Sequence, residues 1–156
     1  MKGKNKGFSL VELIVVIAIM AIGVTVTSYS LTTISLANAK ECASEIKASL
    51  EAVRMETCRK ESGSAPTVKF YRDSDGSVMM QESGSSAKKI GSSTVAVSYK
   101  KADGSYEDLG TTALEYSFNR STGAFTLMPG SEIKVSSGGR EYIITCYEKT
   151  GKIKME

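Results

Sequence analysis

The sequence predicts an α+β protein in which one long N-terminal helix packs against an antiparallel β-sheet head. Two observations favour this class. After a continuous apolar run near the N-terminus, the residues from Leu36 to Thr57 repeat at intervals of three and four, which is the spacing of one helix face. From residue 63 onward, short runs of β-branched and aromatic residues are separated by turns that contain glycine, as in β-hairpins. A chain of 156 residues suffices for one such domain with an appended segment.

Residues 8–30 are expected to form a membrane-spanning helix. After the short basic stretch of residues 1–7, the chain turns apolar at Phe8, and the apolar run to Val26 is close to the ~20 residues that cross a bilayer core. The lysines of residues 1–7 predict that the N-terminus stays in the cytoplasm and that everything after the run lies outside. Glu12 is the one charged residue in the run, and a carboxylate there costs about 2.5–3.5 kcal/mol. Glu12 either reaches the membrane edge or pairs with a cation inside an assembly.

Residues 31–62 continue the helix with a different character. From Lys40 on, charged residues occupy its other faces, and one apolar stripe remains to pack against a soluble domain. The stripe consists of Leu36, Ala39, Ala43, Ile46, Leu50, Val53 and Thr57. Gly63 and Pro66 disfavour further helix, so we expect the helix to end at about Ser62.

Residues 63–156 are expected to form the antiparallel sheet head. The candidate strands are 67–71, 78–81, 94–100, 114–119, 125–128, 133–136, 141–148 and 152–155. Pairs such as Asp75-Gly76 and Asp103-Gly104 lie between them and suit tight turns, so neighbouring strands should run antiparallel. The alternation of Leu114, Tyr116 and Phe118 would place one apolar face on the helix. Residues 83–93, rich in Gly, Ser and Lys, are expected to form an exposed loop.

The junction Gly7-Phe8-Ser9-Leu10-Val11-Glu12-Leu13 resembles the class III signal of type IV pilins and pseudopilins, in which a basic leader ends in Gly and an aromatic residue is followed four positions later by Glu. The resemblance covers about a fifth of the chain. It implies a pilin-like fold, cleavage between Gly7 and Phe8 by a prepilin peptidase, and methylation of the new amino group of Phe8. It also implies that Glu12 pairs with the Phe8 amine of a neighbouring subunit.

The resemblance thus implies a structural subunit of a type IV pilus or pilus-like filament, not an enzyme. Its partners would be the membrane, the prepilin peptidase, the assembly machinery of the cytoplasmic membrane, and copies of itself or other pilins in an extracellular filament. A pseudopilin of a type II secretion or competence (DNA uptake) system is the alternative. A further alternative is a soluble secreted binding protein with an ordinary signal peptide, cut after Ala37-Asn38-Ala39.

Composition disfavours several other functions. The chain has no histidine, so the commonest general base and metal ligand is missing, and we expect no catalytic site, cofactor or metal. Beyond Lys2, Lys4 and Lys6 the basic residues only balance the acidic ones, so no nucleic-acid surface is predicted. The stretch 73–77 resembles the start of a calcium loop, but it lacks the closing glutamate at the required spacing, so a turn is expected.

The three cysteines allow one intrachain disulfide. Cys42 and Cys58 are sixteen residues apart on the predicted helix, about 24 Å along its axis, far beyond the ~4.4–6.8 Å between the α-carbons of a disulfide. Cys146 is therefore the intrachain partner for either, and we expect Cys58 with Cys146 because Cys58 lies near the helix end. Pairing of Cys42 with Cys146, and three buried thiols, remain open.

Overall fold

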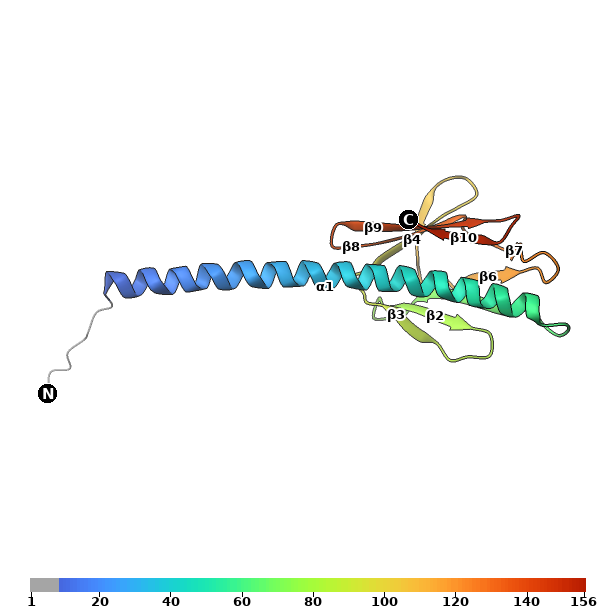
Figure 1. Ribbon diagram of the computed structural model, residues 1–156, viewed down its shortest axis with the longest axis horizontal. Helices are drawn as coiled ribbons and strands as arrows, with labels where there is room; N and C mark the ends of the chain where they lie inside the picture. The colour runs from blue at the N-terminus through green and yellow to red at the C-terminus, as the bar shows by residue number, and fades with distance from the viewer. Residues whose placement is uncertain (1–8) are drawn as a thin grey trace. The chain divides into compact units, whose positions relative to one another are not determined.

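The computed structural model describes the backbone of residues 9–156 and the side chains of residues 9–24 and 36–156 (Figure 1). The chain divides into two compact units, residues 1–34 and residues 35–156. In the described part, one helix is followed by strands that pair antiparallel, so the predicted α+β class is confirmed. The predicted leader, residues 1–7, and Phe8 lie outside the described residues. The predicted boundaries at residues 30 and 62 remain predictions.

Helix α1 comprises Leu10–Arg59, slightly shorter than the predicted 8–62. Its last turn closes with the Lys60 amide donating to the carbonyl of Glu56 at 3.1 Å. Gly63, in the loop that follows the helix, adopts a φ of 93°, in the left-handed region that favours glycine. The sequence signal for the end was correct, but the helix stops before the Ser-Gly-Ser stretch rather than inside it.

The strands form two five-stranded sheets, where the sequence predicted one. Their bounds are β1 Thr67–Arg72, β2 Val78–Glu82, β3 Lys88–Gly91, β4 Ala96–Lys100, β5 Tyr106–Asp108, β6 Leu114–Phe118, β7 Phe125–Leu127, β8 Glu132–Ser137, β9 Arg140–Tyr147 and β10 Lys152–Met155. The first sheet has the order β3-β2-β1-β6-β7, and the second has the order β10-β9-β8-β4-β5. The chain passes from the first sheet to the second between β3 and β4. It returns to the first sheet at β6, which pairs with β1.

Eight strands lie where they were predicted, with ends shifted by at most two residues. Two strands correct the prediction. β3 forms inside the stretch 83–93 that was expected to be an exposed loop, because Ile90 is only 7% exposed and turns its side chain into the core. β5 was not predicted, and all three of its residues are exposed, so no buried apolar position marks it in the sequence.

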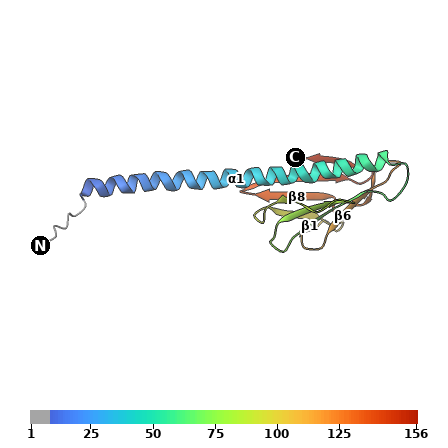
Figure 2. The same ribbon diagram turned by 90° about the horizontal axis from the view of Figure 1, so that it is seen from below.

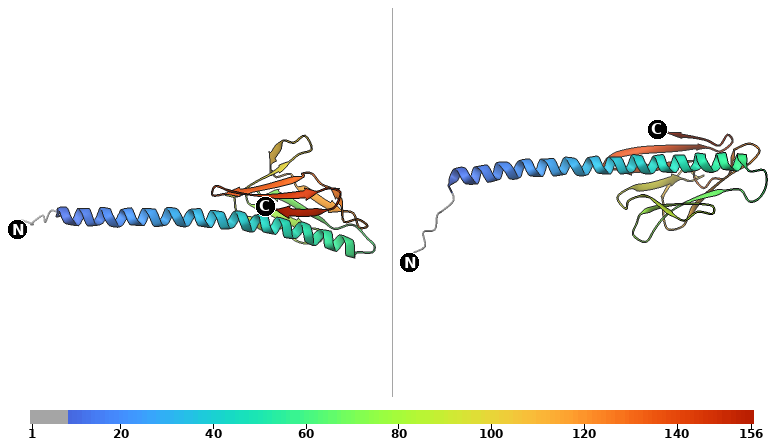
Figure 3. Two further views of the ribbon diagram at one scale, coloured as in Figure 1. Left: turned by 45° about the horizontal axis from the view of Figure 1, so that its top comes forward. Right: turned by 60° about the horizontal axis from the view of Figure 1, so that its bottom comes forward.

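The core of the second unit lies between α1 and both sheets. Figures 2 and 3 show strands of both sheets beside the part of α1 that belongs to this unit. The predicted stripe is confirmed from Ala39 to Thr57, and Leu36 is half-buried. Cys42 and Ser49 join the buried face of the helix. Aromatic rings of the first sheet fill the interior, in the edge-on contacts of Phe70 with Tyr116 and of Tyr116 with Phe125.

Two arginines tie separate segments of this unit together. The Arg72 guanidinium, at the end of β1, donates to the carbonyl oxygens of Gly76 at 2.6 Å, Val95 at 2.7 Å and Leu109 at 3.1 Å. Val95 precedes β4 and Leu109 follows β5, so Arg72 joins the first sheet to the second. On α1, Arg54 similarly donates to the carbonyl oxygens of two loops, at Gly123 and Thr150.

Candidate functional site

The first turn of α1 contains the described part of the predicted processing and assembly site. The backbone amide of Glu12 donates to the Ser9 hydroxyl oxygen at 3.2 Å, and the amide of Leu13 donates to the Ser9 carbonyl at 3.2 Å. Ser9 is therefore the N-cap residue, and Glu12 is the third residue of the helix. A Ser followed three positions later by Glu is the capping-box pattern. The Glu12 carboxylate lies in the turn where the helix dipole favours negative charge.

Of the three residues predicted to act here, the structure describes only Glu12, whose side chain is exposed. Gly7 and Phe8, on either side of the predicted cleavage, lie outside the described residues. The sequence did not lead us to expect Ser9 as the N-cap of the helix. The Ser-x-x-Glu spacing at residues 9–12 is the signal that would have identified it.

The helix that follows Glu12 carries exposed apolar side chains around its whole circumference. The large apolar residues of the stretch 10–24 are exposed by fractions from 42% at Val16 to 73% at Leu10. They are Leu10, Val11, Leu13, Ile14, Val15, Val16, Ile17, Ile19, Met20, Ile22 and Val24. A helix that is apolar all round is stable when lipid or other protein covers it, and patches this large mark such contacts.

Within the described residues, no helix is both long enough and apolar enough to cross a membrane.

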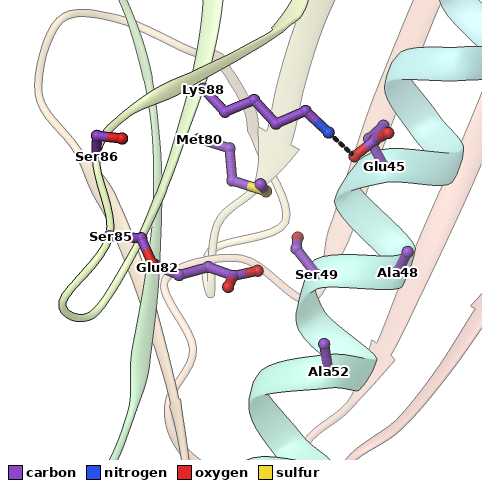
Figure 4. Close-up of a pocket in the computed structure, with 9 residues that line it drawn as sticks. All are labelled: Glu45, Ala48, Ser49, Ala52, Met80, Glu82, Ser85, Ser86 and Lys88. Carbon is purple, nitrogen blue, oxygen red and sulfur yellow. Dashed lines mark hydrogen bonds and ion pairs between the residues drawn. The ribbon is translucent and has the colours of Figure 1, made fainter.

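A surface groove lies on the second unit between α1 and the β2–β3 hairpin (Figure 4). It encloses about 380 Å³, and Ala48, Ala52 and Met80 supply its apolar side chains. An ion pair of 3.0 Å between Lys88 and Glu45 crosses it from hairpin to helix, and the Glu82 side chain extends from β2 toward α1. The groove therefore offers a small apolar patch beside charged groups.

Residues 73–77, which resemble the start of a calcium loop, form a turn, as predicted. The Asp75 carboxylate accepts hydrogen bonds from the backbone amide and the hydroxyl of Ser77, both at 2.8 Å. These bonds, led by the backbone amide, lower the pKa of Asp75. Among the described residues, no three His, Cys, Asp or Glu side chains are grouped closely enough to hold a metal ion.

The expected disulfide between Cys58 and Cys146 is not formed in the structure, where all three cysteines, each within the described residues, are free. Cys146 lies on β9 opposite Ile153 and is buried in the core, whereas Cys58 is exposed near the end of α1. Cys42 is also buried, and burial raises the pKa of both the Cys42 and the Cys146 thiols to about 12. The open alternative of buried thiols thus describes Cys42 and Cys146 but not Cys58.

Comparison with known proteins identifies the N-terminal segment. Residues 2–28 match the family described as the prokaryotic N-terminal methylation motif. No curated protein and no solved structure matches the chain. The chain therefore carries a class III prepilin signal, typical of type IV pilins and pseudopilins, and the resemblance drawn from Gly7 to Leu13 is confirmed. The motif implies processing by a prepilin peptidase and anchoring in the inner membrane before assembly.

Proposed function

We propose that this protein is a structural subunit of a type IV pilus or pilus-like filament, assembled by bundling of its apolar helix with the same helix of other subunits. The observation that carries the proposal is the exposed apolar surface of residues 10–24, which surrounds Glu12 inside a matched methylation motif. Leaving a large apolar side chain in water instead of burying it costs roughly 1.5–3 kcal/mol, so lipid or other subunits must cover these residues. Between helices that leave lipid, close packing of side chains supplies the attraction. Packing of several copies would bury many such side chains at once.

Cleavage between Gly7 and Phe8 would supply the partner that Glu12 needs. It creates an amine on Phe8, and the methylated amine remains a cation. A carboxylate in apolar surroundings is tolerated when it is paired with a cation, and an unpaired one is strongly destabilising. Glu12 is exposed in the single chain, so its carboxylate is accessible to the Phe8 amine of a neighbouring subunit. This pairing would set the stagger between successive subunits.

Before assembly, residues 8–30 would hold the protein in the cytoplasmic membrane with its N-terminus inside and its head outside. The assembly machinery would then extract the processed subunit into a filament on the cell surface. The apolar helix would exchange lipid for neighbouring helices, so its side chains would stay out of water throughout.

The proposal is tested by Glu12→Gln, which removes the charge and preserves the size of the side chain. We expect the variant to be processed and to reach the membrane, and the yield of sheared filaments to fall more than tenfold. Glu61→Gln, on an exposed residue beyond α1, is the matched control. Mass spectrometry of the mature protein should find Phe8 with one extra methyl group at the N-terminus. Normal filament yield for Glu12→Gln would rule out the pairing, and a mature N-terminus at Lys40 would establish the ordinary signal peptide instead.

A pseudopilin of a type II secretion or competence system is the second candidate, because the match to residues 2–28 fits it equally well. Purified filaments separate the two. A major pilin should dominate their mass, whereas a pseudopilin should yield little surface fibre.

A further inference from the structure

The groove between α1 and the β2–β3 hairpin combines an apolar floor with a carboxylate (Figure 4). Ala48 and Ala52 of α1 and Met80 of β2 form the floor. The Glu82 side chain extends from β2 toward α1 and is half-buried. Among the described residues, its carboxylate accepts no hydrogen bond and forms no ion pair. Glu45, at the same groove, is already paired with a lysine of the hairpin at 3.0 Å.

The size and chemistry of this groove fit one cationic side chain. Its volume of about 380 Å³ is near the lower end of the ~300–1,000 Å³ of pockets that bind small ligands. Lysine and arginine bury their aliphatic stems against apolar surface and keep the charged end in polar surroundings. The floor suits such a stem, and the Glu82 carboxylate suits its charge.

A second hairpin lies on the opposite flank of the same helix. There the Arg54 guanidinium donates to the Thr150 carbonyl at 3.1 Å and holds the β9–β10 turn against α1. Arg54 and Glu45 are nine residues apart, about two and a half helical turns, so their side chains leave opposite sides of α1. Glu45 therefore marks the flank of the groove, and Arg54 marks the flank of the β9–β10 hairpin. Figures 1 and 3 show the two hairpins on either side of α1.

The outer face of the β9–β10 hairpin carries a cation beside an aromatic ring. Lys152 lies directly opposite Tyr147 in the strand register, so the two side chains share one face. Both are exposed, Tyr147 by 45%. Within the described part of the chain, the Lys152 ammonium has no ion pair. Tyrosine is enriched where proteins contact each other. This face therefore offers the cation that the groove on the other flank lacks.

We propose that the head docks side by side onto a second copy of this chain, with Lys152 of one copy entering the groove of the next and pairing with Glu82. Tyr147 would lie beside it against the apolar floor. The inference rests on the proposed function, because a filament brings copies of the head together in one orientation. It adds a contact between heads to the bundling of the apolar helices.

A second copy is the occupant because the two complementary surfaces belong to one chain and lie on opposite flanks of α1. Each copy would use its groove for one neighbour and its β9–β10 hairpin for the other. Such a contact is heterologous, and one that does not close into a ring extends into an open helical assembly. The geometry of the head thus agrees with a filament of identically oriented subunits.

Charge reversal tests the pairing. Glu82→Lys and Lys152→Glu each place like charges in the contact, and we expect each to lower the yield of sheared filaments by about threefold or more. The double variant Glu82→Lys/Lys152→Glu restores opposite charges and should recover most of the yield. Glu61→Lys, on an exposed residue beyond α1, is the matched control. Urea denaturation should give the same midpoint for all variants, because neither charge has an ion pair in its own head.

Cross-linking tests the occupant and the geometry. Ser86→Cys, at the groove, and Lys149→Cys, in the β9–β10 turn, are combined in a full-length chain with Cys58→Ser, which removes the exposed native thiol. A short bifunctional maleimide is added to sheared filaments. We expect a series of dimers, trimers and larger products of this chain, whereas each single cysteine variant should give no product beyond a dimer.

The outcomes separate this inference from the proposed function. A wild-type chain that forms no filaments would remove the proposed function itself. Wild-type filaments, with normal yields for both single reversals or no recovery in the double variant, would overturn only the contact between heads. A cross-linked series that stops at dimers would show a two-fold contact, and cross-links to a different protein alone would show another occupant. Either result would overturn the proposed docking.

Discussion

The two described stretches of α1 place similar apolar residues in opposite surroundings. In residues 10–24, Leu13 is 56% exposed and Ile17 is 58% exposed, whereas in the head Leu50 is 0% exposed and Ile46 is 1% exposed. The head stretch confines its apolar residues to one stripe, and strands of the same chain cover it. The first stretch has apolar residues on every side. The stability of the head is therefore built into the chain, whereas that of residues 10–24 must come from lipid or other subunits.

Helix propensity sharpens this difference. Residues 10–24 are rich in Ile and Val, which are several tenths of a kcal/mol less favourable than Ala in a helix. Isolated helices in water are marginal even with good helix formers. In a membrane or a helix bundle, however, an unbonded backbone amide costs several kcal/mol, so the helix becomes the favoured state. The composition of this stretch suits a helix that is seldom in water.

The largest expected effect is the difference in head stability between two truncations, one in each stretch of α1. Leu50→Ala leaves a cavity in the core and should lower the free energy of unfolding of the head by about 2–5 kcal/mol. Ile17→Ala removes an exposed side chain and should change that free energy by less than about 0.5 kcal/mol. Urea denaturation of the detergent-solubilised full chain, followed by the summed fluorescence of its seven tyrosines, measures both.

The filament yield per folded head should be lower for Ile17→Ala than for Leu50→Ala. Ile17→Ala should reduce assembly although its head is intact, because it removes apolar area that neighbouring subunits would bury. Equal loss of head stability in the two variants would show that residues 10–24 are packed within their own chain, and the contrast between the stretches would then collapse.

A smaller effect is expected at Arg72, which joins the two sheets of the head. Arg72→Met keeps the aliphatic part of the side chain but removes the donors to the carbonyls of Gly76, Val95 and Leu109. We expect the head to lose about 1.5–3 kcal/mol, the range for hydrogen bonds that involve a charged group. Arg72→Lys should recover only part of this loss, because one ammonium group cannot match the guanidinium fork. Urea denaturation measures both variants, and an unchanged midpoint for Arg72→Met would show that the sheets hold together without it.

The sequence was sufficient to predict the elements with local signals. The three- and four-residue spacing from Ala39 to Thr57 defined the buried face of α1, and glycine turns separated eight of the strands. The sequence did not reveal the two sheets, because hairpin signals are local, whereas the pairing of Phe70 with Leu114 joins residues far apart in the chain. β3 was missed because Ile90 is the one large apolar residue among the Gly, Ser, Ala and Lys of residues 83–93.

The candidate site was predictable to a different degree. The junction from Gly7 to Glu12 was sufficient to identify the methylation motif, since its residue types and spacing are specific. The capping role of Ser9 is also readable from the Ser-x-x-Glu spacing of residues 9–12. Spacing along the chain could not show the surroundings of the cysteines: Cys146 is a buried free thiol and Cys58 an exposed one, and their pairing stays a prediction.

The smallest predicted effect concerns the charged surface of the head, a feature that residues 10–24 lack apart from Glu12. On β8, the Glu132 carboxylate accepts hydrogen bonds from the Tyr106 hydroxyl at 2.6 Å and the Lys100 ammonium at 2.9 Å. These two bonds, that of Tyr106 first, lower the pKa of Glu132. A carboxyl whose pKa is lower in the folded state stabilises the fold above its unfolded pKa, and this contribution disappears as the pH falls through the folded pKa.

Glu132→Gln should therefore lower the melting temperature of the head by about 1–3 °C at pH 7, a small effect because the pair is at the surface. The difference from the wild type should shrink as the pH falls below about 4.5 toward 3, because the Glu132 carboxyl then binds a proton more readily in the unfolded chain than in the folded head. Thermal melts of the full chain across this range measure it, with Glu148→Gln, on an exposed residue, as the control. A difference that stays constant from pH 7 to pH 3 would mean that packing of the side chain, and not its charge, supports the β4–β5 hairpin against β8.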